Sequence, residues 1–216
     1  MKLRTIALVL SVALVSAAAH AQTGVYVTGD AQQFTQKGVD YTLTSPSSLN
    51  IDKLGLYGAV YGVYYDFNRL PLIGKLKTGP IAFGVDGRGD TFRVQVYGSQ
   101  IDRQDGIFSL RISAKKPMKQ KYMFNTAPYA QGGFGVGHTR NALRTYYNND
   151  FIYQFSVGLD RPLSKKYKHL DWRVLEVSGG SLANYPTGYY MGNGGAGPNQ
   201  SNHTLEIGTG IVFRSR

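Results

Sequence analysis

Cysteine is absent from the 216-residue chain, and tryptophan occurs once. The lack of cysteine excludes a disulfide framework and any thiolate chemistry. Helical periodicity is missing beyond the N-terminal segment, and no metal-ligand spacing, phosphate-cradling loop or dinucleotide fingerprint is present. The glycine-rich stretch 132–137 falls within a predicted strand and opens no helix. We therefore expect no cofactor and no metal.

The N-terminus has the pattern of a secretory signal peptide. Lys2 and Arg4 precede an apolar run over residues 6–19, which Ala19-His20-Ala21 follows as a small-x-small cleavage site. The run is shorter than the roughly 17 residues that a spanning helix needs, and no other stretch approaches that length. The sequence predicts a signal peptide over 1–21, cleaved after Ala21, and one domain over 22–216.

The rest of the chain favours strands and turns. It contains 16 Tyr, 10 Phe and 27 Gly, and aromatic residues pack well on pleated surfaces. Apolar and polar residues alternate with the two-residue period of a strand in eight segments. These segments are 24–34, 55–67, 81–90, 107–114, 126–138, 151–160, 170–178 and 204–213.

Alternation alone does not say which face points inward. A soluble, lipocalin-like barrel turns its apolar face inward, whereas an outer-membrane barrel turns it to lipid. The polar face here is rich in glycine and carries both signs of charge, and aromatic residues lie near strand ends. We therefore predict an all-β fold, an eight-stranded antiparallel up-and-down transmembrane β-barrel. A soluble periplasmic barrel is the alternative.

Four places carry a resemblance to a known group. They are the aromatic-glycine strand Tyr57–Phe67, the segment Ala127–Gly137, the segment Asp171–Val177 and the terminal aromatic Phe213. The chain resembles the small outer-membrane β-barrel proteins, including the OmpA, OmpX and OmpW-like families and the porin family. The resemblance implies an integral protein of the cell outer membrane, inserted by the barrel-assembly machinery. One departure is that Arg214-Ser215-Arg216 follow the terminal aromatic residue.

Charged residues fall on the face predicted to be interior. Eight strands enclose a space that side chains fill, so interior charges must pair. The expected interior polar network is Asp30, Asp86, Arg88, Arg111, Glu176 and Glu206, with Asp66, Asp90 and Asp160 nearer the rims. We expect Arg88 and Arg111 to form a cationic centre that packs the lumen, or alternatively a gate.

Three connections, at 67–78, 115–122 and 161–169, carry no Asp or Glu and hold 11 of the 22 basic residues of the mature chain. In the barrel topology they share the periplasmic rim, where lysines can reach lipid phosphates. The predicted rim comprises Lys75, Lys77, Lys115, Lys116, Lys119, Lys121, Lys165, Lys166 and Lys168. Outer-membrane lipids are the expected partner and nucleic acid is not, because the chain is exported and lacks recognition motifs.

The other connections, at 35–53, 92–105, 139–149 and 179–203, are mostly longer and more polar, so they could hold an unknown surface ligand. His138 is followed by Thr139-Arg140, where a deacylase-type barrel would need His-x-Ser, so no catalytic residue is expected. The leading hypothesis is a non-enzymatic outer-membrane barrel with a structural or surface-interacting role. The alternatives are a narrow channel, a lipid-modifying barrel enzyme and a soluble periplasmic binding barrel.

Overall fold

The computed structural model describes residues 22–40, 47–67, 79–96, 99–118, 124–141, 144–164, 166–181 and 201–215. It contains eight strands. They are β1 (Gln22–Asp40), β2 (Ser47–Phe67), β3 (Ile81–Val96), β4 (Ser99–Ala114), β5 (Ala127–Asn141), β6 (Arg144–Pro162), β7 (Leu170–Ser181) and β8 (Ser201–Arg214). The predicted signal peptide lies outside the described residues, so its cleavage stays a prediction.

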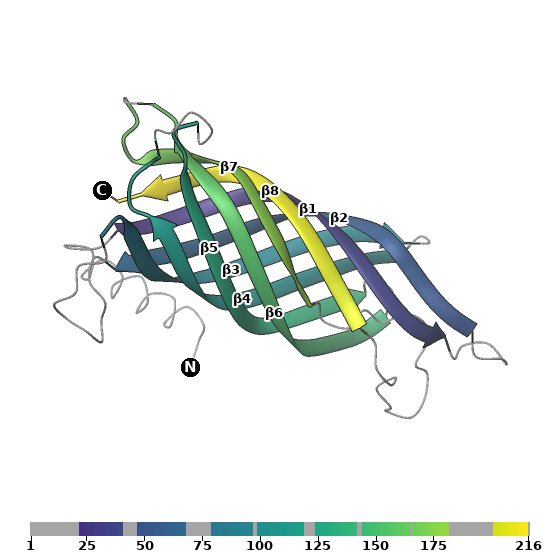
Figure 1. Cartoon of the computed structure of the whole chain (residues 1–216). Coiled ribbons are helices and arrows are strands. Elements are labelled where there is room, and N and C mark those ends of the chain that lie inside the picture. Colours follow the sequence, from purple (N-terminus) through teal and green to yellow (C-terminus); the bar gives the residue numbers. More distant parts are fainter. Residues whose placement is uncertain are drawn as a thin grey trace, which may run out of the picture.

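Each strand pairs with the next, and β1 pairs with β8, so the sheet closes into a barrel (Figure 1). All neighbouring pairs are antiparallel. At the closing seam the register runs from Gly24 opposite Arg214 to Lys37 opposite Ser201. The start of β1 and the end of β8 therefore lie at one end of the barrel, which we call the C-terminal rim. The fold class predicted from alternation is confirmed.

The outward-facing side chains form an apolar belt around the wall. Leu110 and Phe155, for example, are 69% and 65% exposed, whereas their sequence neighbours are buried. Such extensive aromatic and aliphatic exposure around a closed sheet is the pattern of a barrel embedded in lipid. The prediction of an inverted alternation is thereby confirmed. In the described part of the chain, no helix is long and apolar enough to cross a membrane.

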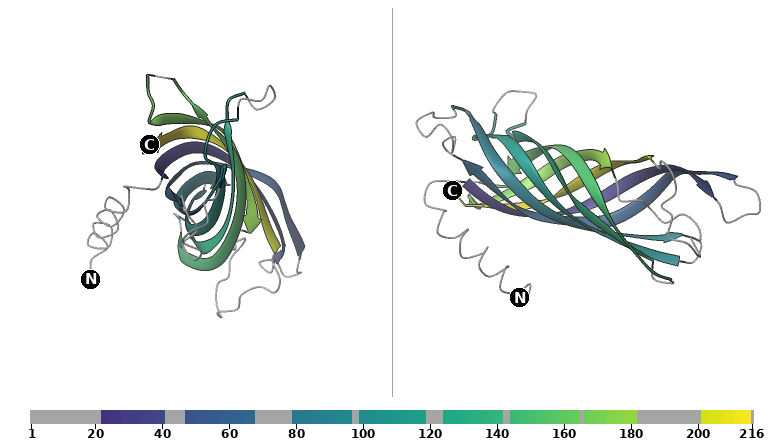
Figure 2. Two further views of the ribbon diagram at one scale, coloured as in Figure 1. Left: turned by 60° about the vertical axis from the view of Figure 1, so that its left-hand side comes forward. Right: turned by 90° about the horizontal axis from the view of Figure 1, so that it is seen from below.

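Several connections predicted as long polar loops are largely strand. β1 and β2 remain paired from Gln36–Ile51 to Asp40–Ser47, and β3 and β4 remain paired as far as Val96–Ser99. The prediction of loops at 35–53, 92–105 and 139–149 is therefore wrong over most of their length. These segments continue as hairpins because antiparallel neighbours satisfy their backbone hydrogen bonds, even where the apolar alternation fades. They extend the barrel away from the C-terminal rim (Figure 2).

Candidate functional site: the charged lumen

The lumen holds all six residues of the predicted interior network. Asp30, Asp86, Arg88, Arg111, Glu176 and Glu206 are each at most 5% exposed. Asp66, Asp90 and Asp160, which we expected nearer the rims, are equally buried. Within the described part of the chain, the buried charged side chains comprise nine carboxylates and five arginines, with no lysine. Arginine suits this role because its planar guanidinium binds several carboxylates and stacks on rings.

Arg88 lies at the centre of the network. Its guanidinium is 2.9 Å from the Glu176 carboxylate and 3.2 Å from that of Glu206, and it donates to the Ser156 hydroxyl at 3.0 Å. These partners come from β6, β7 and β8, whereas Arg88 belongs to β3. The side chain thus crosses the lumen and ties opposite walls together.

Arg111 forms a separate layer nearer the C-terminal rim. Its guanidinium is 3.5 Å from Asp66 and 3.7 Å from Asp160, and it donates to Gln131 at 3.2 Å. It lies 4.2 Å from the ring centre of Tyr64 and 3.9 Å from that of Tyr129. The structure places this layer apart from the Arg88 contacts, and a third arginine bridges the two.

That third arginine, Arg173, was missed from the sequence. It donates to Asp160 at 3.0 Å and to Glu176 at 2.8 Å. Strict alternation along 170–178 places Arg173 and Glu176 on opposite faces, and that expectation is wrong. A β-bulge between them inserts one extra residue relative to β8, so both side chains turn inward. A bulge has no clear mark in a single sequence.

Two further arginines extend the network to both ends. Arg214 donates to Asp160 at 3.1 Å and lies 3.0 Å from Asp171, which closes the C-terminal rim. Arg103 pairs with Asp105 and donates to Gln32 at 2.6 Å in the opposite half. Arg103 falls in the segment predicted as a loop, and Arg214 in the tail that departs from the family pattern. Sequence reasoning therefore missed both.

Three interior tyrosines lie directly against glycines of the neighbouring strand. Tyr26 is paired with Gly62, Tyr64 with Gly24, and Tyr129 with Gly158. A Cβ built on any of these glycines would meet the opposing ring within 2.2–2.6 Å. The glycines thus let the rings lie close to the wall, where they present their faces to arginine. Arg173 lies 4.1 Å from the ring centre of Tyr26 and 4.6 Å from that of Tyr129.

Hydroxyl groups complete the central layers. The Tyr26 hydroxyl donates to Asp86 at 3.0 Å, and the Tyr129 hydroxyl donates to Glu176. Ser113 donates to Asp66 at 2.8 Å. Most carboxylates in the half nearer the C-terminal rim are therefore bound by an arginine, a hydroxyl or both. Such satisfaction is what makes buried charge tolerable.

The opposite half is less complete. Asp30 and Asp90 are buried, but neither carboxylate oxygen of either residue meets a hydrogen-bond donor among the described residues. Asp90 also lies directly opposite Asp105 across the β3–β4 ladder. Glu206 is better supported, because Gln32 and Gln154 donate to it at 3.3 and 3.4 Å. Among the described residues, the lumen away from the C-terminal rim thus holds two buried carboxylates, Asp30 and Asp90, that form no ion pair.

The described parts of the predicted basic rim lie at the C-terminal rim. Lys116, Lys166 and Lys168 are exposed and Lys115 is half-buried. Lys75, Lys77, Lys119, Lys121 and Lys165 lie outside the described residues. The backbone N–H of Lys115 donates to the carbonyl of Pro80, and that of Arg214 donates to the carbonyl of His169. These contacts bring the ends of the three acid-free connections to one rim.

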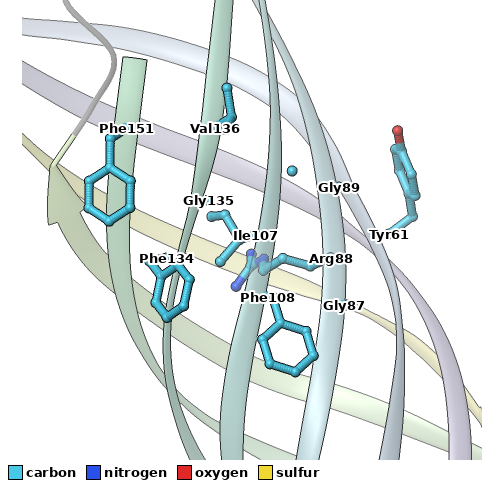
Figure 3. A pocket seen from close by; sticks show the side chains of 11 residues that line it. Tyr61, Gly87, Arg88, Gly89, Ile107, Phe108, Phe134, Gly135, Val136 and Phe151 are labelled. Carbon is cyan, nitrogen blue, oxygen red and sulfur yellow. The ribbon is translucent and has the colours of Figure 1, made fainter. Parts of the chain in front are cut away.

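The arrangement favours packing over ligand binding in the lumen. A hollow of about 620 Å³ lies on the outer wall, where Gly87, Gly89 and Gly106 thin the belt between Tyr61 and a group of phenylalanines (Figure 3). Its apolar lining suits hydrocarbon rather than a polar solute. Among the described residues, no group of three or more histidines and carboxylates is arranged to hold a metal ion.

Comparison with known proteins bears on the fold. No protein-family model and no curated protein matches the chain. Among solved structures, Neisserial surface protein A aligns with a TM-score of 0.50 and 9% identity over 88% of this chain and 96% of that one. The outer membrane protein AlkL aligns with a TM-score of 0.45 and 11% identity over 91% of each chain. OprG from Pseudomonas aeruginosa aligns with a TM-score of 0.43 and 10% identity over 91% of this chain and 97% of that one. The predicted resemblance to small outer-membrane barrels is confirmed at the level of the fold.

Proposed function

We propose that this chain, which has the fold of the small eight-stranded outer-membrane barrels, is a non-enzymatic integral membrane protein with a closed lumen. In this role it contributes to envelope integrity or to surface interactions through its long hairpins. The observation that carries the proposal is a continuous series of contacts along the lumen. The series runs through Arg214, Asp160, Arg173, Glu176, Arg88, Glu206, Gln32 and Arg103.

This series supports a closed barrel because a solute could pass only by separating buried ion pairs. Breaking one such pair by removing a partner destabilises a protein by about 3–5 kcal/mol. Tyrosine rings stacked on Arg111 and Arg173 occupy the space between the charged layers. Rigid packing therefore explains the lumen better than transport does.

Planar-bilayer conductance tests the closed state. We expect the wild-type barrel to show no discrete conductance steps, and Arg88→Ala with Arg173→Ala to introduce leakage. Arg93→Ala is the control, because Arg93 pairs with Asp102 at 2.8 Å on the outer face of the barrel. Wild-type steps that disappear when Arg88 or Arg111 is replaced would contradict the proposal and favour a pore.

Insertion into the membrane has its own test. We expect the protein to fractionate with the outer membrane and to migrate differently in detergent gels before and after boiling. Recovery of the folded protein from the periplasmic supernatant would contradict membrane insertion and favour a soluble barrel.

A narrow cation path is the second candidate, and the unpartnered carboxylates of Asp30 and Asp90 favour it. It requires a wild-type conductance with cation selectivity that falls in Asp30→Asn with Asp90→Asn.

For the lipid-modifying enzyme, the test is lipid A mass analysis with and without the protein, and we expect an unchanged profile. A modified lipid A species that depends on the protein would contradict the non-enzymatic role.

A further inference from the structure

The described parts of two turns, β4–β5 and β6–β7, lie beyond the strand ends at the C-terminal rim. They lie on the same side of the molecule in Figure 1 and in the left-hand view of Figure 2. Backbone hydrogen bonds hold their described parts in place, because Met118 donates to Thr126 at 2.8 Å and Leu163 donates to Leu170 at 3.2 Å.

Both turns expose large apolar side chains beyond the ends of the strands. Phe124 is 73% exposed, Tyr167 55%, Leu163 45% and Met118 40%. Phe124 also has a φ of 45°, a left-handed conformation that a bulky residue rarely adopts. The backbone is therefore strained while its aromatic ring remains in contact with little of the protein. Contact with a partner outside the barrel would account for this exposure.

Cationic side chains flank these apolar groups. Lys116, Lys166 and Lys168 are exposed beside them, and Lys166 Nζ lies 5.6 Å from the ring centre of Tyr167. The sequence contains no Asp or Glu over 115–126 or 161–169. The surface thus combines apolar rings with unopposed positive charge.

We propose that these two turns form a foot that binds the anionic phospholipid surface of the periplasmic leaflet. The foot comprises Met118, Phe124, Leu163 and Tyr167 with Lys115, Lys116, Lys166 and Lys168. The rings enter the headgroup boundary while the lysines meet phosphates. This inference rests on the proposed function, because it requires the barrel to lie in a membrane.

Position and composition favour a lipid over other anionic partners. The outward-facing belt reaches Ile112, which is 47% exposed and lies two residues before the end of β4, and the exposed Ala130 near the start of β5. The foot therefore begins where the hydrocarbon-facing wall ends. A carbohydrate polymer such as peptidoglycan would match the charge of the lysines but leave the four apolar side chains in water.

Quenching by brominated lipids tests the proposal locally. The reporter is Phe124→Trp in a Trp172→Phe background, which removes the single native tryptophan. The refolded barrel is placed in phosphatidylcholine vesicles that contain 20% brominated phosphatidylglycerol or 20% brominated phosphatidylcholine. We expect stronger quenching by the anionic lipid, and the excess should fall as salt screens the surface.

Matched double variants separate the foot from total charge. Lys115→Ala with Lys116→Ala should reduce the apparent preference for phosphatidylglycerol. The reduction should be at most about fivefold for each lysine removed. Lys37→Ala with Lys53→Ala removes the same charge from β1 and β2 far from this rim, and it should leave the preference unchanged.

Three results would overturn the proposal. They are equal quenching by the two lipids, equal effects of the two double variants, and a lysine-dependent association with purified peptidoglycan without any lipid preference. Failure of the proposed function is distinguishable, because a chain that does not insert shows neither heat-modifiable migration nor quenching by any brominated lipid.

Discussion

At the scale of single residues, the interior depends on tyrosine rings that lie against glycines. Tyr26 over Gly62 and Tyr129 over Gly158 present flat faces to Arg173, so the small residue on one strand shapes a charge layer on another. A glycine here serves packing rather than backbone freedom. The change in stability when such a glycine is replaced by alanine should therefore depend on whether its position faces the lumen or the outside.

A pair of glycine substitutions checks this. In Gly62→Ala the new Cβ would lie 2.4 Å from the Tyr26 hydroxyl and 2.8 Å from the Gly87 carbonyl, so we expect destabilisation of about 1–3 kcal/mol. Gly87→Ala places its Cβ in open space on the outer face and should be neutral or slightly stabilising. Urea unfolding in lipid or detergent provides the measurement. Equal losses in the two variants would contradict the packing role.

A second pair concerns buried carboxylates. Asp160→Asn weakens contacts to Arg173 and Arg214, so about 3–5 kcal/mol of the unfolding free energy should be lost. Asp90→Asn removes a charge that no described donor meets, and stability should be unchanged or higher. Unfolding midpoints of both variants, compared with wild type, test this. A larger loss in the Asp90 variant would show that its carboxylate has a partner.

At the scale of elements, the seam between β1 and β8 is held past the terminal aromatic residue. Ser215 donates its backbone N–H to the Thr23 carbonyl at 2.8 Å, and its hydroxyl accepts from the Thr23 N–H at 3.1 Å. Arg214 adds its ion pairs to Asp160 and Asp171 inside the rim. The tail that departs from the family pattern therefore completes this barrel.

Truncation at this seam gives a prediction. A chain that ends at Phe213 loses the Arg214 and Ser215 contacts, and we expect it to unfold at a lower temperature in detergent gels. A chain that ends at Ser215 keeps all of these contacts and should migrate and unfold like wild type. If both truncations behave alike, Arg214 and Ser215 do not stabilise the seam.

At the scale of the whole molecule, the barrel buries charged side chains and exposes apolar ones, an arrangement that suits a surrounding of lipid rather than water. The prediction is that Leu110→Arg, in the belt and 69% exposed, destabilises the barrel by up to about 4 kcal/mol, because arginine on the lipid-facing wall is costly and most so at the bilayer midplane. Gln104→Arg lies on the same face of β4, exposed beyond the belt, and should be nearly neutral. In a soluble barrel both substitutions would be tolerated. Refolding yields and unfolding free energies in lipid vesicles distinguish the two cases.

By itself, the sequence determined the number of strands, their positions along the chain and the orientation of their faces, with apolar side chains outward and polar ones inward. Because side chains alternate along a strand, each residue from 151 to 160 can be assigned to the inner or the outer face once it is known which face is inside. The sequence also identified Arg88 and Arg111 as interior cations, because both lie on the polar, glycine-rich face of their strands, which was predicted to line the lumen.

Only the tertiary structure decided how those charges are paired. The β7 bulge turned Arg173 inward, the continued β3–β4 hairpin placed Arg103 over the lumen, and the closing seam brought Arg214 to Asp160. Each of these depends on how one strand pairs with its neighbours in the closed barrel. A one-residue shift in register reverses the face of a side chain, so local patterning cannot specify it.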